Sequence, residues 1–163
     1  MEIRILKPRD VKEKYVSWMI DKEVVKYSEN QYRSFSIEKQ KSYVKKCYLE
    51  KDIDLYGIFI NSEHIGNICL KGLTSIHKRA EISYLIGPKN LWGKGIANRA
   101  VAEIINKVKE KYELNKLYAG IAKENIGSKR VLEKNNFVLE GIRKNHLFFN
   151  NTFMDQLDYG LIL

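Results

Sequence analysis

The segment with the clearest chemical potential is a glycine-rich turn, Trp92-Gly93-Lys94-Gly95-Ile96-Ala97, which joins a β-rich run to an amphipathic helical pattern. Its two glycines allow the backbone to turn sharply and to approach a ligand closely. The first N–H groups of the following helix have no intrahelical partner, and they carry the positive end of the helix dipole. The turn is therefore expected to bind an anion such as a pyrophosphate.

The spacing of this turn separates it from two common phosphate-binding motifs. A P-loop has four residues between its glycines and a Ser or Thr after its Lys. Here five residues separate Gly87 from Gly93, and Gly95 follows the lysine. A dinucleotide fingerprint needs a third Gly or Ala and an acid at the end of the next strand, where this chain has Asn98 and Ala122. An NTPase and a dehydrogenase are disfavoured, and a purely structural turn remains the alternative.

The cysteines and histidines give no metal or disulfide pattern. Cys47 and Cys69 lack C-x-x-C spacing and a neighbouring His, so both are expected to be buried free thiols. His64, His77 and His146 are scattered along the chain, without the H-x-E spacing of a metal site. No metal is expected.

Hydrophobic periodicity predicts four helices. The most regular pattern covers residues 95–112, where apolar residues recur at steps of one, three and four: Ile96, Ala100, Val101, Ile104, Ile105 and Val108. Further helices are predicted over residues 11–20 with Asp10 as the N-cap, from an imperfect capping box at Ser36 to about residue 50, and over residues 127–135.

Alternating and β-branched runs predict seven strands. They cover residues 2–6, 55–60, 64–70, 80–86 and 116–122, and two further strands from residue 138 onward turn at Asn150-Asn151. The second and third are close enough to form a hairpin. This order predicts an α/β fold in which helices cover both faces of a mixed sheet, as a single domain of residues 1–163.

Composition sets the broad class of protein. The chain has 44% hydrophobic and 30% charged residues, no apolar stretch near twenty residues, and no secretory pattern at its start, so a cytoplasmic globular protein is expected. Its formal charge of +9 comes mostly from Lys spread over the whole chain. A polyphosphorylated cofactor and a nucleic acid both fit that charge, which does not choose between them.

Three motifs in this order resemble the GNAT acetyltransferases: the glycine-rich turn before a long helix, the run 117–122, and Asn125-x-x-Ser128 opening a short helix before Phe137. The resemblance spans nearly the whole chain. The closing stretch 147–159 is similar to the branch containing ribosomal-protein Nα-acetyltransferases and spermidine acetyltransferases. The resemblance implies a central mixed sheet of about seven strands and about four helices, splayed between the fourth and fifth strands.

The same resemblance implies acetyl-coenzyme A as the donor co-substrate. The pantetheine arm would pair with the fourth strand at Leu85 and Ile86, and Asn125 and Ser128 would contact pantetheine and adenosine-side groups. Backbone groups would hold the pyrophosphate, with Asn98 and Arg99 nearby: Gly93, Lys94, Gly95, Ile96 and Ala97. Trp92 stands where the family commonly has Gln or Arg, a change that backbone contacts tolerate.

Acetyl transfer to a primary amine is expected to proceed by direct attack, because no Cys-His or Ser-His pair has a suggestive spacing. The amine must first lose a proton, and Glu81, in a largely apolar strand beside the expected thioester, is the candidate base. An ion pair between Glu81 and Lys78 or Arg79 is the structural alternative.

The proton donor is less directly implied, since Leu132 stands where many relatives have a Tyr that protonates the departing thiolate. Tyr84 is the candidate acid in its place. The N–H group of Ile86 is the candidate donor to the oxyanion.

The acceptor, a small-molecule or peptide amine, is not specified by the sequence. Trp18, Tyr27, Tyr32 and Arg33 lie in the region that forms the acceptor wall in the family, although core packing explains Trp18 equally well. Ribosomal N-termini, polyamines, amino sugars and aminoglycosides are all acetylated on this scaffold. The positive charge favours a sugar nucleotide or a ribosome-associated target over spermidine. A non-catalytic module that binds coenzyme A or RNA is the other alternative; a nucleic-acid or membrane partner is not expected, and a homodimer is allowed.

Overall fold

The computed structural model describes residues 1–163. Its helices are η1 (Pro8–Asp10), α1 (Glu13–Ile20), η2 (Glu29–Tyr32), α2 (Ile37–Leu49), η3 (Lys89–Leu91), α3 (Ile96–Lys111) and α4 (Ile126–Lys134). Its strands are β1 (Glu2–Ile5), β2 (Ile53–Ile60), β3 (Glu63–Lys71), β4 (Arg79–Ile86), β5 (Lys116–Ala122), β6 (Val138–Phe149) and β7 (Thr152–Ile162). No helix has both the length and the apolar character needed to cross a membrane.

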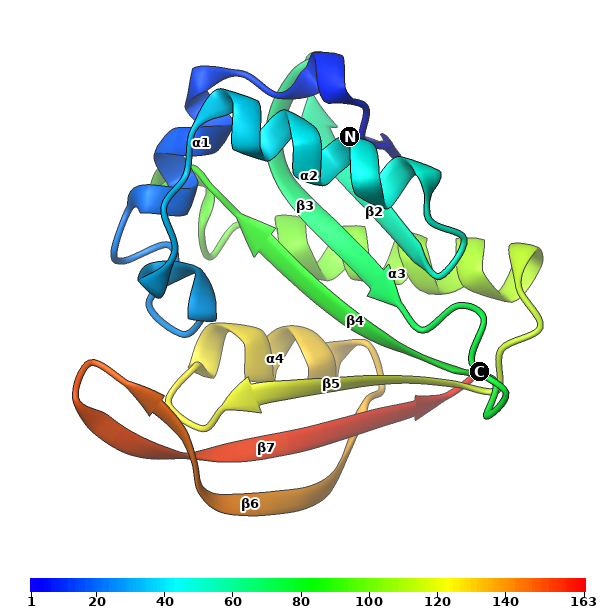
Figure 1. Cartoon of the computed structure of the whole chain (residues 1–163). Coiled ribbons are helices and arrows are strands. Elements are labelled where there is room, and N and C mark those ends of the chain that lie inside the picture. Colours follow the sequence, from blue (N-terminus) through cyan, green and yellow to red (C-terminus); the bar gives the residue numbers. More distant parts are fainter.

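The strands form one seven-stranded sheet in the order β1-β2-β3-β4-β5-β7-β6 (Figure 1). All neighbours are antiparallel except β4 and β5, which are parallel. These two strands pair only at Arg79↔Lys116, Ala80↔Leu117 and Glu81↔Tyr118. Beyond Glu81 they diverge, and Figure 1 shows the resulting gap. The predicted mixed sheet, splayed between the fourth and fifth strands, is confirmed.

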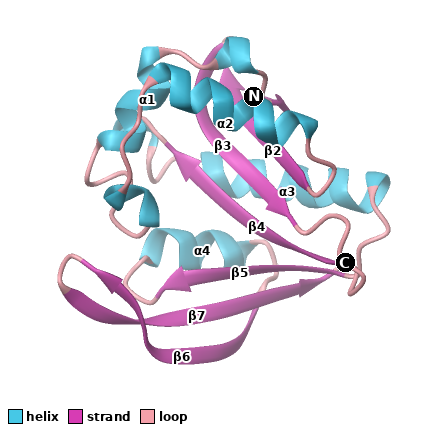
Figure 2. Cartoon of the chain, viewed as in Figure 1, coloured by secondary structure: helices cyan, strands magenta, loops and turns pink.

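Helices cover both faces of this sheet, with α1 and α2 on one side and α3 and α4 on the other (Figure 2). The side-chain alternation of β2 shows how one strand serves both layers. Leu55 and Phe59 belong to the core cluster under α1 and α2, whereas Tyr56 and Ile58 belong to the larger cluster that packs against α3. The predicted apolar stripe of α3 is fully buried in that larger cluster.

The prediction for the first helix is wrong at its start. The helix α1 begins at Glu13 with Lys12 as the N-cap, and Asp10 instead ends the short helix η1. The Asp10 carboxylate accepts two hydrogen bonds from Arg4, at 2.8 and 2.9 Å, and one from the N–H of Lys7 at 2.8 Å. Because these donors occupy its oxygens, Asp10 does not cap α1.

The remaining local signals gave correct element ends within about two residues. The Ser36 hydroxyl accepts a hydrogen bond from the N–H of Lys39 at 3.2 Å, which caps α2 as predicted. The two hairpins turn at Asn61-Ser62 and at Asn150-Asn151, where all four residues have positive φ angles. Such turns match the twist of the strands, and Asn tolerates their left-handed conformation.

Candidate active site

A cavity of about 440 Å³ lies where β4 and β5 diverge. Its sheet wall includes residues 81–85 of β4 and 119–122 of β5, and its floor includes Asn125 and Ser128 at the start of α4. The opposite wall comes from α1, from the segment around η2, and from the beginning of α2. The cavity therefore exists because the sheet loses its pairing after the Glu81–Tyr118 pair.

The end of β4 presents a free backbone edge to this gap. The N–H of Gly87 donates to the carbonyl of Ile65 in β3 at 2.9 Å, so by alternation the N–H and C=O of Ile86 face the opposite side. The indole N–H of Trp92 donates to that Ile86 carbonyl at 2.8 Å. Trp92 thus ties the glycine-rich turn to the end of β4, and the N–H of Ile86 stays available to a ligand.

The glycine-rich turn forms an open cradle of amide groups. Gly93 and Gly95 have φ angles of 73° and 74°, and a Cβ added at either would meet no atom within 4 Å. Glycine is required there by backbone conformation rather than by crowding. The N–H groups of residues 93–98 donate no hydrogen bond within the chain, and the first helical bond runs from the N–H of Arg99 to Gly95 at 3.1 Å.

This cradle has the features of an anion-binding site. Free N–H groups at a helix N-terminus bind anions, and the 16-residue helix α3 begins here. Lys94 and Arg99 are exposed beside the cradle, and neither forms an ion pair with an acidic residue of the chain. Their positive charges are therefore available to phosphate oxygens.

Two polar side chains expected near the donor, Asn98 and Asn125, form hydrogen bonds within the fold. The amide of Asn135 donates to the side-chain oxygen of Asn98 at 3.0 Å and to its carbonyl at 3.3 Å, which links α4 to α3. The side-chain oxygen of Asn125 accepts from the N–H of Ser128 at 3.1 Å and caps α4. Asn125 and Ser128 line the cavity, whereas the side chain of Asn98 is committed to the helix contact.

Glu81 and Tyr84 both line the cavity from β4. Glu81 is half-buried and lies at the last β4–β5 pair. The expected ion-pair alternative is wrong, because Lys78 pairs with Glu113 at 3.6 Å and the Arg79 guanidinium stacks 5.7 Å from the Tyr118 ring. Glu81 is the one acidic residue of the cavity wall, and no cation neutralises it.

Tyr84 extends across the gap from β4 toward α4. Its hydroxyl donates to the carbonyl of Ser128 at 3.0 Å. Burial raises the pKa of Tyr84 above its ordinary value, so the hydroxyl keeps its proton at neutral pH. Leu132, by contrast, is 0% exposed in the larger core cluster and does not line the cavity.

Residues 1–138 match a family model described as acetyltransferase (GNAT) domain. The chain belongs to the GNAT acetyltransferase family. It is 30% identical over 100 residues to the uncharacterized N-acetyltransferase YoaA of Bacillus subtilis, and 29% identical over 109 residues to the ribosomal-protein-serine acetyltransferase of Escherichia coli. These alignments cover 61% and 67% of this chain but 56% and 60% of the relatives, so the chain spans less than two thirds of their length.

The GNAT fold is also clear from solved structures. A ribosomal-protein alpha-N acetyltransferase in complex with coenzyme A superposes with a TM-score of 0.88 at 20% identity, and the match covers 99% of this chain and 93% of that one. At this level of identity the likeness establishes the shared fold alone. Residues of this GNAT domain must therefore be assigned from its own geometry.

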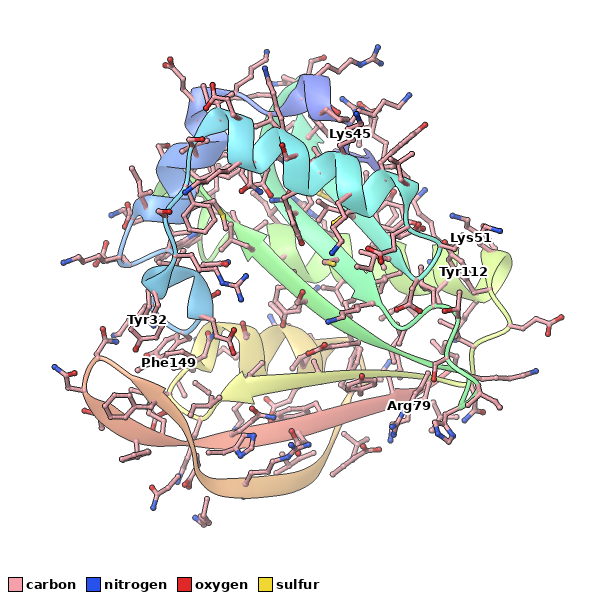
Figure 3. The ribbon with its side chains drawn as sticks, viewed as in Figure 1. Tyr32, Lys45, Lys51, Arg79, Tyr112 and Phe149 are labelled. Atoms are coloured by element: carbon pink, nitrogen blue, oxygen red, sulfur yellow. The ribbon has the colours of Figure 1, made fainter.

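The acceptor-side predictions divide into two groups in this GNAT domain. Tyr27 and Arg33 line the cavity, whereas Trp18 and Tyr32 do not. Trp18 is buried, and its ring packs so closely on Gly87 that a Cβ there would collide with it. Tyr32 is exposed, and it contacts the β6–β7 hairpin instead, with its hydroxyl 3.1 Å from the Phe148 carbonyl and its ring stacked on Phe149 (Figure 3).

Several residues of the cavity wall were missed from the sequence. Cys69, expected to be buried, is half-buried on the cavity wall, and burial raises its pKa to about 12, which keeps it a thiol. Asn67 lines the cavity and lies 2.8 Å from His64 Nε2. A polar residue inside the apolar run 65–70 was the available signal for Asn67. Lys39 and Gln40 also line the cavity, from the start of α2.

Proposed function

We propose that this protein transfers the acetyl group of acetyl-coenzyme A to a primary amine. The observation that carries the proposal is the divergence of β4 and β5, which places a carboxyl group, a protonated tyrosine and a free strand edge in one cavity. The amide cradle of residues 93–98 lies at the end of the same strand, tied to it by Trp92. We also propose that residues 1–163 form a single catalytic domain, because one continuous sheet joins all seven strands.

Each part of the donor has a suitable set of groups in this arrangement. The N–H groups of residues 93–98 would bind the diphosphate, with Lys94 and Arg99 adding positive charge. The free edge of β4 at Ile86 would lie along the pantetheine arm, whereas the N–H and C=O of Leu85 face β3 by the same alternation. Asn125 and Ser128 would contact the arm from the other side of the gap. Acetyl-coenzyme A supplies the acetyl group as a thioester.

Residues of the chain would then accept the protons that the amine loses, protonate the thiolate and stabilise the developing oxyanion. Glu81 takes the proton from the incoming ammonium group, directly or through water, so that the amine becomes nucleophilic. Tyr84 gives its hydroxyl proton to the departing thiolate, and the second proton that the attacking nitrogen loses as the amide forms restores the Tyr84 hydroxyl. The N–H of Ile86, which faces the gap, donates to the carbonyl oxygen as negative charge develops on it. Direct attack is favoured because the Cys69 thiol stays protonated.

The test combines coenzyme A binding with thiol release. Calorimetry should detect coenzyme A binding to the wild type, and a panel of amines should include at least one that releases thiol from acetyl-coenzyme A. Gly95→Val should weaken binding strongly, because valine rarely adopts a φ of 74°. Gly141→Val is the matched control, since a side chain there meets no atom within 4 Å and its φ is ordinary.

Two results would contradict the proposal. Absence of heat with coenzyme A, or equal affinity in both glycine variants, would remove the diphosphate site. Retention of intact acetyl-coenzyme A with every amine would identify a binding module without catalysis. A peptide N-terminus belongs in the panel because one relative is named a ribosomal-protein-serine acetyltransferase. An amino-sugar nucleotide, a polyamine and an aminoglycoside complete it.

A further inference from the structure

We propose that the amine acceptor also carries a negatively charged group, a carboxylate or a phosphate, which binds to Arg33 and Lys39 on the wall opposite the sheet. The inference rests on the proposed acetyl transfer, because it names the class of acceptor for that same cavity. It is carried by the distribution of charge around the cavity and by what each charged group contacts.

The lining residues with acidic or strongly basic side chains are Glu81, Arg33 and Lys39. Glu81 projects from β4 at the point where the strands part. Both cations come from the other wall, one directly after η2 and the other in the first turn of α2. In Figure 1 the gap widens from the junction of β4 and β5 toward η2. An acceptor with its amine at Glu81 would therefore extend toward positive charge.

Neither cation is strongly neutralised within the chain. Arg33 lies 3.2 Å from Glu29, but both side chains are exposed, at 62% and 79%, and such pairs contribute little in water. Glu29 is not part of the cavity wall. The ammonium of Lys39 donates to the hydroxyl of Ser34 at 2.6 Å, which is a neutral partner. Both side chains keep their charge available to a ligand.

The position of Lys39 is not explained by helix stability. A cation in the first turn of a helix is opposed by the helix dipole, and the N-cap Ser36 already satisfies the N–H of Lys39. The same helix end makes the local potential more positive. The neutral side chains of Asn30 and Ser34 line this wall as well and can donate hydrogen bonds to an anion.

The charged residues of the cavity wall also argue against a polycationic acceptor. A polyamine needs a carboxylate for each ammonium group that enters the cavity, and Glu81 is the one carboxylate there. Its second ammonium would approach Arg33 and Lys39, which repel it. The formal charge of +9 adds a long-range field that attracts anionic acceptors and disfavours cationic ones.

The experiment measures thiol release with matched acceptors that differ in one anionic group. Glucosamine 6-phosphate is compared with glucosamine, a dipeptide with a free carboxylate is compared with its C-terminal amide, and spermidine is the polycation. In each pair the anionic member should have a kcat/KM about 10- to 100-fold higher, as expected for a charge-assisted contact. The two pairs distinguish phosphate from carboxylate as the preferred group.

Variants then locate the source of the preference. Arg33→Gln with Lys39→Gln should reduce kcat/KM for the preferred anionic acceptor about 10- to 100-fold, and should reduce it much less for the partner that lacks the anionic group. Affinity for coenzyme A should not change. Lys45→Gln is the control for the lysine substitution, since it also removes one positive charge from α2. Figure 3 shows Lys45 on the outer side of α2, away from the gap. Thermal unfolding checks that each variant is folded.

The outcomes separate this inference from the proposed function. Equal use of charged and neutral partners, preference for spermidine, or an unchanged ratio in the double variant overturns the inference, while acetyl transfer stands. A wild type that binds acetyl-coenzyme A but releases no thiol with either anionic acceptor also overturns it. A protein that neither binds coenzyme A nor releases thiol with any amine overturns both proposals.

Discussion

The hydroxyl of Tyr84 donates a 3.0 Å hydrogen bond to the carbonyl of Ser128, and this bond spans the gap between β4 and the first turn of α4. We expect Tyr84→Phe to lower kcat about 100-fold or more, because the ring remains while the transferable proton is lost. Affinity for coenzyme A, measured by calorimetry, should change little. Tyr118→Phe is the control, since Tyr118 lies on neighbouring β5 outside the cavity wall. Equal losses in the two variants would argue against a proton-donating role.

Glu81 has no cation within ion-pair distance, so its replacement tests chemistry rather than a structural pair. Glu81→Gln should reduce kcat about 100- to 10,000-fold with little change in coenzyme A affinity. The pH–rate profile should change shape, because a group that accepts a proton in the mechanism is gone. Glu110→Gln, an exposed change on α3, should leave the profile intact. A Glu81→Gln profile with the wild-type shape would remove Glu81 from the mechanism.

His64 should make stability depend on pH. Its Nε2 lies 2.8 Å from the Asn67 side-chain oxygen and 2.9 Å from the Gly66 carbonyl, so Nε2 carries the proton, while buried Nδ1 has no partner. Burial lowers the pKa of His64 below its ordinary value of 6.5, although hydrogen bonds to Asn67 and Gly66 and the charge of Asp10 oppose this and Arg4 adds to it. Below about pH 6.5 the unfolded chain therefore binds a proton that the folded protein excludes.

The free energy of unfolding should accordingly be highest above pH 6.5 and fall as the pH is lowered toward the folded pKa, by at most about 1.4 kcal/mol per pH unit. Urea unfolding of the wild type and of His64→Gln between pH 7.5 and 5 measures this slope. The glutamine keeps a donor but cannot titrate, so its slope should be smaller. His146→Gln, on the exposed face of β6, should retain the wild-type slope.

Asp54 should contribute strongly to stability. Its Oδ2 accepts hydrogen bonds from the Tyr56 hydroxyl at 2.7 Å, from the Lys111 ammonium at 3.0 Å and from the Tyr112 hydroxyl, which joins the start of β2 to the end of α3. Burial alone would raise the pKa of Asp54, but these donors hold it below its ordinary value. Asp54→Ala should lower the free energy of unfolding by about 2 kcal/mol or more at pH 7, measured in urea. Glu110→Ala is the control, and similar losses would contradict the role of the cluster.

The sequence was most informative where signals were local. The stripe of α3, the two glycines at positive φ and the Asn-rich turns follow from helical periodicity and backbone sterics within a few residues. Asp10 failed as a cap because Arg4, six residues earlier on β1, competes for its oxygens. A capping rule that considers only neighbouring residues does not include the contact between Arg4 and Asp10.

The cavity could be predicted only in part, because its walls come from distant segments. Alternation along the strand predicts that Cys69 and the residues before and after it point to opposite faces of the sheet. It does not tell which of the two faces lines the cavity. Trp92 could be recognised as an unusual residue, yet its bond to Ile86 depends on how the turn folds back on β4. Trp18 and Tyr27 lie nine residues apart in one region, and only the fold separates a core residue from a cavity residue.

The contact of Tyr32 with Phe148 and Phe149 joins positions 116 residues apart in the chain. The region around η2, which supplies part of the cavity wall, is therefore in contact with the β6–β7 hairpin. If substitutions around η2 alone changed the acceptor preference, the β6–β7 hairpin would no longer fit the altered segment. Selection for a new amine, in nature or in the laboratory, should consequently yield paired changes at the two ends of the gene.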